Sequence, residues 1–509
     1  MPESTSQITG AASARKGMAA SIAWNYTGHL YQICINLGLT AYIVRRIAVP
    51  EYGLLLFVMS LSATLNILDM GISSVLVQTY VEAAGNADKR RVNDLISTAF
   101  LTLAGLGFIG ALALSGLSLL LPGPFNIPHP YLHEASLVFL IAALVLQFSL
   151  PSIALEQVYQ ASQRFDRISQ MRLVTSTLQL ILTVAILAAG FRIVGLALVQ
   201  LLSAALELLL LAVMLPSSVL GARLSCTRFK WNLLAPLMSL SKWALLNNIL
   251  TSFFDLAVWL ILGSLGSMQA AAMFGLAGKL PRQLWNLVDK GAIVALPSMS
   301  RFAMHGDLAG LQQIFLKSQK LVIGAILPFI VLGCVFARPL IQVWAGSQYS
   351  DAAVVMQWLL LAALAHAVVY SSDLLLYACS RIRKAAWISF AGGAISVTGA
   401  TLLVSRYGAA GMAAALAITQ ILFGGGWFTL EACRLSHTPA RLFFRTVVHG
   451  LAWPFFVMAA EIALILGIWR FLSSAWLVVA AVVSGCVYLG IWSWRTALPL
   501  YRSRTEIAG

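Results

Sequence analysis

The sequence predicts an all-α polytopic membrane protein with about 14 transmembrane helices. Of its 509 residues, 60% are apolar and only 10% are charged, whereas soluble domains are about a quarter charged. Most charged residues lie between apolar runs that reach the roughly 20 residues a helix needs to cross the hydrocarbon core. The net charge of +15 does not indicate nucleic-acid binding, because no soluble domain is left to carry a basic patch.

The apolar runs predict the helices in order along the chain. The run after the polar tail 1–17 is too long and too polar for the core of a signal peptide, so we assign it as the first spanning helix. The expected spans are 18–44, 52–80, 94–120, 135–160, 170–190, 193–215, 237–262, 268–298, 317–344, 351–378, 386–405, 407–432, 447–470 and 474–497. Their connections are short, so we expect no catalytic domain and no enzymatic activity.

The basic residues predict the orientation of the chain. Most Lys and Arg residues fall in alternate connections, which places both termini in the cytoplasm by the positive-inside rule. The connections predicted on the other side hold only Arg45, Arg46, Arg192, Arg338, Arg406 and Arg470. The six cysteines are far apart without a C-x-x-C pair, so we expect free thiols and no disulfide framework, zinc site or cofactor.

An internal repeat divides the chain. N-I-L-D-M-G, starting at Asn66, returns 220 residues later as N-L-V-D-K-G from Asn286, and Y-Q-A-S-Q-R-F from Tyr159 resembles Y-A-C-S-R-I-R from Tyr377. We expect two parallel six-helix bundles around a central cavity, as in transporters. The predicted parts are tail 1–17, bundle 18–215, basic linker 216–236, bundle 237–432, helices 13 and 14 in 447–497, and tail 498–509.

Polar stripes mark the predicted walls of that cavity. In the first helix, polar residues from Asn25 to Thr40 recur at steps of four and three, so they share one helical face. Hydrogen bonding between packed helices is the alternative explanation. The predicted polar lining consists of Asn25, His29, Gln32, Asn36, Ser62, Asn66, Asn248, Thr251, Asn286, His366 and Tyr370.

Acidic residues inside the predicted spans are candidates for ion coupling. Ionisable groups are expensive to bury in a membrane and commonly mark ion pathways. The candidates for taking up H⁺ or Na⁺ are Asp69, Asp255, Asp289 and Asp373. A protonated, neutral Asp that only packs between helices is the alternative.

The eighth span carries the most informative charges. Lys279, Arg282, Asn286 and Asp289 recur at steps of three, four and three, and therefore share one face. A cation at the bilayer centre costs about 2.5–3.5 kcal/mol, so it needs a partner, a wet cavity or an anionic ligand. Asp289 is one available partner for Arg282, but one carboxylate cannot neutralise two cations. Pro281 is expected to kink this helix.

Two segments of the second span resemble a known family. P-E-Y-G-L-L-L-F-V-M-S-L (Pro50–Leu61) and L-D-M-G-I-S-S-V-L-V-Q (Leu68–Gln78) are similar to the Wzx-type polysaccharide-biosynthesis flippases of the multidrug/oligosaccharidyl-lipid/polysaccharide exporter superfamily. The resemblance implies a transporter of the bacterial inner membrane that flips undecaprenyl-diphosphate-linked oligosaccharides to the outer leaflet by alternating access, for exopolysaccharide or O-antigen-type synthesis. It also implies a glycan polymerase and glycosyltransferases as pathway partners, with membrane lipids around the protein.

The resemblance and the charge pattern agree at the eighth span. A diphosphate is an anion, and Lys279 and Arg282 are suited to bind it by charge-assisted hydrogen bonds. A cation-coupled multidrug exporter is the main alternative, which the cations of this span disfavour. An integral-membrane glycan polymerase or ligase would need a large outer loop with catalytic groups, and a scaffold protein would leave the intramembrane charges without a role.

Overall fold

The computed structural model describes residues 31–69, 72–85, 89–120, 125–215, 224–225, 229–233, 242–292, 295–467 and 473–494. These residues form helices and connections, with no strand among them, and the predicted all-α fold of a multi-span membrane protein is confirmed. Nine helices in this part of the chain are long and apolar enough to cross a membrane. The total of fourteen and the six-helix repeat stay predictions. The contacts divide the chain into two units, Met1–Trp259 and Leu260–Gly509.

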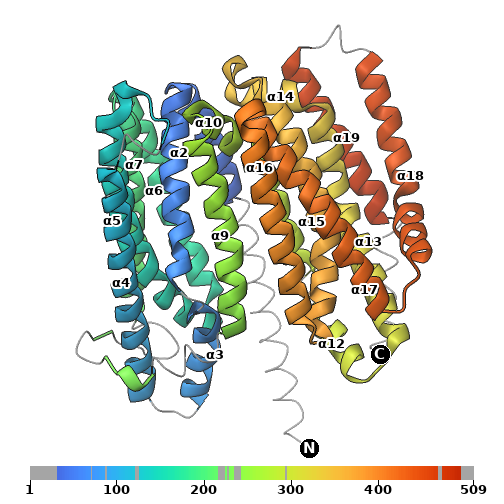
Figure 1. Ribbon diagram of the computed structural model, residues 1–509, viewed down its shortest axis with the longest axis horizontal. Coiled ribbons are helices and arrows are strands. Elements are labelled where there is room, and N and C mark those ends of the chain that lie inside the picture. The colour runs from blue at the N-terminus through green and yellow to red at the C-terminus, as the bar shows by residue number, and fades with distance from the viewer. Residues whose placement is uncertain are drawn as a thin grey trace, which may run out of the picture. The chain divides into compact units, whose positions relative to one another are not determined.

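The first unit is built around one long central helix, α5. Its elements are helix Tyr31–Val44, α2 (Val49–Thr64), the 3₁₀ turn η1 (Leu65–Asp69), α3 (Ile72–Gly85), α4 (Lys89–Leu119), η2 (His129–Tyr131), α5 (Leu132–Ala161), α6 (Phe165–Ala188), α7 (Ile193–Val213) and most of α9 (Lys242–Ser264) (Figure 1). Helix α5 packs against α2, α3, α4 and α7.

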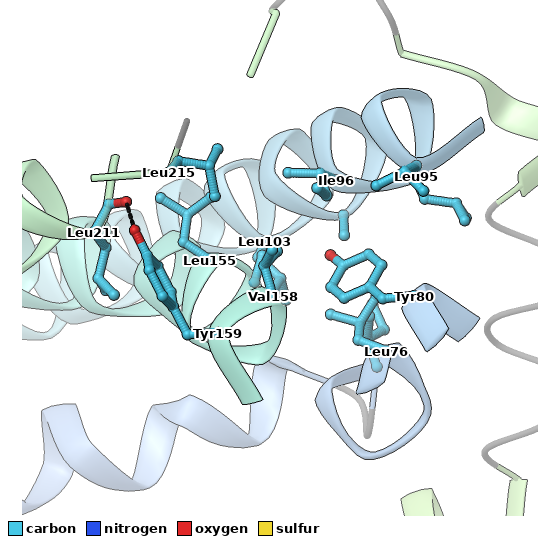
Figure 2. Close-up of a cluster of buried hydrophobic side chains, with 14 of the residues drawn as sticks. Leu76, Tyr80, Leu95, Ile96, Leu103, Leu155, Val158, Tyr159, Leu211 and Leu215 are labelled. Carbon is cyan, nitrogen blue, oxygen red and sulfur yellow. Dashed lines mark hydrogen bonds between the residues drawn. The ribbon is translucent and has the colours of Figure 1, made fainter. Parts of the chain in front are cut away.

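The core of this unit is apolar, with tyrosines whose rings are fully covered. Figure 2 shows Tyr80 of α3 beside Ile96 of α4, and Tyr159 of α5 beside Leu211 of α7. The Tyr159 hydroxyl donates a hydrogen bond to the Leu211 carbonyl at 2.9 Å. Because a buried polar group without a partner is costly, this bond helps to fix α5 against α7.

The second unit is built around α15. Its elements are α10 (Met268–Ala277), α11 (Lys279–Ala292), α12 (Leu296–Met304), α13 (Leu308–Val335), α14 (Ala337–Ala345), η6 (Ser347–Tyr349), α15 (Ala352–Ala378), α16 (Ile382–Thr419), the π-helix η7 (Gln420–Phe428), α17 (Thr429–Leu435), α18 (Ala440–Gly467) and α19 (Ser474–Trp492) (Figure 1). Helix α15 packs against α10, α11, α12, α13, α14, α16, α17 and η7.

Three predicted spans are continuous helices by sequence and broken helices in the structure. Span 317–344 divides into α13 and α14 at Phe336. Span 52–80 changes to a 3₁₀ turn at Leu65, and α3 starts only at Ile72. Span 268–298 divides into α10, α11 and α12, with the first break at Gly278. Proline at position 281 explains that break, because it has no N–H to donate to the Ala277 carbonyl and its ring crowds that group.

The π-helix η7 packs closely against α15 at a glycine. A Cβ atom on Gly424 would overlap with Cγ2 of Val369, whereas a Cβ atom on neighbouring Gly425 would meet no atom within 4 Å. Glycine at 424 therefore permits the contact between η7 and α15, which positions the polar residues of α15 described below.

Gly424→Ala is expected to lower the free energy of unfolding by roughly 1–3 kcal/mol, the usual cost of overpacking. Gly425→Ala is the matched control and is expected to have the melting temperature of the wild type or a slightly higher one. The measurement is thermal unfolding of the purified proteins in detergent. Equal melting temperatures for the two variants would show that η7 and α15 do not make this close contact.

Candidate functional site

Two cations stand at the beginning of α11. Lys279 is its first residue and is half-buried, and Arg282 follows one turn later with an exposed side chain. Among the described residues, no carboxylate forms an ion pair with either cation. Their positive charge is therefore available to a ligand.

Asp289, one available partner for Arg282, contacts His366 on α15 instead. Its Oδ1 atom lies 2.8 Å from Nε2 of His366 on α15, where an imidazole N–H can donate to the carboxylate. Arg282 and Asp289 therefore form no direct ion pair within the described part of α11. Two turns of helix separate these residues, and the neighbouring helix supplies a nearer partner. The Asp289 side chain remains 42% exposed, so its carboxylate is not closed off by this contact.

Three rings extend the site from α11 onto α15. The Trp285 indole stacks on the His366 imidazole with centroids 4.7 Å apart and planes at 13°, and the Tyr370 ring lies 5.7 Å beyond His366. The indole Nε1–H is buried and has no hydrogen-bond acceptor in the described part of the chain. Trp285 is not among the residues predicted from the polar pattern, because its side chain is largely apolar, although it lies three residues after Arg282 and four before Asp289.

Asp373 completes the polar surface of α15. It lies one turn after Tyr370 and is half-buried, and its carboxylate forms no hydrogen bond or ion pair with the described residues. We call this set the α11–α15 face. It consists of Lys279, Arg282, Trp285, Asn286, Asp289, His366, Tyr370 and Asp373.

Helix α13 holds α15 from another side. The Gln319 amide, fully buried on α13, donates Nε2–H to the Val368 carbonyl at 2.7 Å and to Oγ of Ser372 at 3.3 Å. Ser318 donates its hydroxyl to Ser371 at 3.0 Å. These buried bonds fix the rotation of α15 about its axis, and so fix which of its residues meet α11. In the sequence, the only sign of these bonds is polar pairs inside two apolar runs, Ser318-Gln319 and Ser371-Ser372.

Two predicted site residues of the first unit have structural roles. The Asp69 carboxylate accepts hydrogen bonds from the backbone N–H of Ser73, at 3.0 Å, and from its hydroxyl. Asp69 thus caps the start of α3, and we do not keep it as a coupling candidate. Ser62 is buried, and its hydroxyl donates a hydrogen bond to the Ala142 carbonyl at 3.1 Å. This bond links α2 to α5, so Ser62 does not line a cavity.

The other predicted residues of the first unit are placed as follows. Gln32 is half-buried and Asn36 exposed on helix Tyr31–Val44, Asn66 is half-buried in η1, and Asp255 is exposed on α9. Asn25 and His29 lie outside the described residues, and so do the side chains of Asn248 and Thr251.

The architecture is that of a multi-span, all-helical integral membrane protein. The chain belongs to the polysaccharide biosynthesis protein family, whose sequence profile matches residues 43–354. The resemblance carried by Pro50–Leu61 and Leu68–Gln78 is thereby confirmed.

The chain is also similar to individual proteins of known sequence or structure. The uncharacterized membrane protein EpsK of Bacillus subtilis (strain 168) is 22% identical over 443 residues, which cover 84% of this chain and 85% of EpsK. The lipid II flippase MurJ, in an inward closed conformation, has a TM-score of 0.70 at 14% identity, over 94% of this chain and 99% of MurJ. An inward-facing multidrug resistance MATE family transporter of the MOP superfamily has a TM-score of 0.65 at 16% identity, over 80% of this chain and 96% of that one. At 14% and 16% identity, these two solved structures show that the fold is shared and nothing more.

Proposed function

We propose that this protein flips an undecaprenyl-diphosphate-linked oligosaccharide from the cytoplasmic to the outer leaflet of the bacterial inner membrane. The observation that carries the proposal is the pair of cations at the start of α11, for which the described residues offer no carboxylate partner. Two cations without an anionic partner inside a membrane protein require compensation, and a lipid diphosphate would supply it. Lys279 and Arg282 would bind its oxygens by charge-assisted hydrogen bonds.

Family and fold support this proposal. The family is one of polysaccharide biosynthesis, and the fold is shared with a protein described as a lipid II flippase. We propose further that both termini are cytoplasmic, that the bundles 18–215 and 237–432 move by alternating access, and that a glycan polymerase and glycosyltransferases act in the same pathway. Remaining polar residues of both bundles would solvate the sugars.

A cation-coupled multidrug exporter is the second candidate, because MATE transporters share the fold and because Asp289 and Asp373 are acidic. An organic cation would, however, be repelled by Lys279 and Arg282 on the same face. The two candidates therefore differ in the charge of their substrate, which an experiment can determine.

The experiment is deletion of the gene in the native bacterium. The flippase proposal predicts that lipid-linked oligosaccharide accumulates in the cytoplasmic leaflet and that surface glycan is lost, and that a plasmid copy of the wild type restores both. Normal glycan export together with a new sensitivity to cationic drugs would favour the exporter instead.

Ion coupling leads to a separate prediction for Asp373, which would take up H⁺ or Na⁺ during the cycle. Flipping by the wild type in proteoliposomes should fall when both gradients are collapsed, and Asp373→Asn should flip about tenfold more slowly, a change of ~1.4 kcal/mol, with no response to the gradients. Asp351→Asn is the matched control, since Asp351 is exposed and makes no capping hydrogen bond at the start of α15. A wild-type rate that ignores both gradients would contradict the coupling.

A further inference from the structure

The α11–α15 face contains more than an anion needs. Beyond Lys279 and Arg282 it presents the stacked rings of Trp285 and His366, the 42% exposed side chain of Asp289 and the ring of Tyr370. With a neutral imidazole at His366, none of these groups carries a positive charge that would attract a diphosphate. They form a second region with a different chemistry.

That chemistry suits a pyranose ring. An aromatic side chain offers an apolar surface with a negative face and positive edges, against which the C–H groups of a sugar can pack. A carboxylate accepts hydrogen bonds from hydroxyl groups, and a tyrosine hydroxyl can donate or accept one. The indole N–H of Trp285 is buried, so the contribution of this side chain to the sugar is the surface of its ring.

The spacing along α11 indicates which sugar would lie there. Trp285 follows Arg282 by three residues and Asp289 follows it by seven, which corresponds to roughly 5 and 10 Å along a helix axis. A sugar bonded directly to the diphosphate would extend over this distance from a phosphate at Arg282. The sugar nearest the lipid is therefore the one within reach of the rings.

The charges indicate what kind of sugar fits. Asp289 and Asp373 both belong to this part of the face. Among the described residues, Asp289 has His366 as its partner and Asp373 has none. A sugar carboxylate placed beside them would be repelled, because like charges close together cost several kcal/mol. Hydroxyl or N-acetyl groups would meet no such barrier.

We propose that Trp285, His366 and Asp289 form a sugar-binding subsite for the residue joined to the diphosphate, and that the acidic groups of the face select a neutral sugar over a uronic acid. This inference rests on the proposed function. It adds a second determinant of substrate choice to the cations, located one to two turns further along α11.

Binding to the purified full-length protein in nanodiscs tests the subsite with three probes. They are undecaprenyl diphosphate without sugar, undecaprenyl diphosphate carrying one neutral hexose, and the same lipid carrying one hexuronic acid. The wild type should bind the neutral-hexose lipid more tightly than either other probe.

Variants of the subsite separate its contribution from that of the cations. Trp285→Leu should weaken binding of the neutral-hexose lipid about tenfold and leave the sugar-free lipid within about twofold, and Trp285→Tyr should recover most of the loss because it keeps a ring. Asp289→Asn should reduce the difference in affinity between the neutral-hexose lipid and the hexuronic-acid lipid. Trp387→Leu, which removes a 63% exposed indole on α16, is the matched control and should change none of these values.

The outcomes distinguish the two proposals. If the wild type binds the sugar-free and neutral-hexose lipids equally, or if Trp285→Leu weakens both to the same extent, the subsite is wrong while the diphosphate site stands. If the wild type binds none of the three lipids, the proposed function is wrong and the subsite with it.

Discussion

Replacing Lys279 and Arg282 together by glutamine is expected to slow the flipping of lipid-linked oligosaccharide on the order of 100-fold or more. Each hydrogen bond to a charged group contributes about 1.5–3 kcal/mol, and each ~1.4 kcal/mol corresponds to a factor of ten. Glutamine keeps a polar side chain that can still donate hydrogen bonds but is shorter and carries no charge, so the loss would report mainly the missing charge. The measurement is the initial flipping rate in proteoliposomes, at equal amounts of reconstituted protein.

Arg301→Gln is the control for this variant. Arg301 is an exposed cation in the last turn of α12, in the same unit, and its loss should leave the flipping rate within about twofold of the wild type, as for most surface substitutions. A wild-type rate for the Lys279/Arg282 double variant would remove the role that we give to the start of α11.

The largest effect on stability is expected at an ion pair of the first unit. The Glu51 side chain near the start of α2 is completely buried, and it pairs with the Arg192 guanidinium from the turn before α7, with Nε 3.1 Å from Oε2. Arg192→Leu would leave a buried carboxylate without its cation, which costs about 3–5 kcal/mol. Glu51→Gln should cost clearly less, because the Arg192 side chain is 56% exposed and can turn to water.

The ranking of three variants tests this asymmetry. In thermal unfolding of the purified proteins, Arg192→Leu should melt lowest, Glu51→Gln higher, and the double variant above Arg192→Leu, because it no longer buries a charge. Equal melting temperatures for the two single variants would show that Glu51 reaches water when Arg192 is absent.

The helices and the cations could be predicted from the sequence, because both depend on local pattern. Apolar runs determine where the chain crosses a membrane, and a step of three or four residues determines which side chains share a face. On this basis the sequence places Lys279, Arg282, Asn286 and Asp289 on one helix, and all four lie on α11.

The partners of these residues could not be predicted, because helical periodicity gives a face and not the neighbour that it meets. His366 is 77 residues from Asp289, and Gln319 is 49 residues from Val368. Trp285 reads as an apolar residue unless its stacking on His366 is known. The sequence predicts a kink from Pro281 but not the full break between α10 and α11 at Gly278, because the helical pattern continues through that position.

The repeated Asn and Asp show the same limit. Asp69 and Asp289 occupy equivalent places in N-I-L-D-M-G and N-L-V-D-K-G, yet Asp69 caps α3 after a 3₁₀ turn, whereas Asp289 lies within α11 and reaches across to α15. The two halves thus use the same residue type in different local structures. In the sequence, cations one to three turns before this aspartate, Lys279 and Arg282, occur only in the second half.

The most direct test of the central claim is a leaflet-accessibility measurement in proteoliposomes containing the purified protein. A fluorescent undecaprenyl-diphosphate oligosaccharide is placed in both leaflets, and the fraction reached by an external quencher is followed with time. We expect that fraction to rise beyond one half of the probe within minutes for the wild type, and to stay near one half for the Lys279/Arg282 double variant and for empty liposomes. A wild-type trace that matches the empty liposomes, while a cationic dye is transported, would contradict the account.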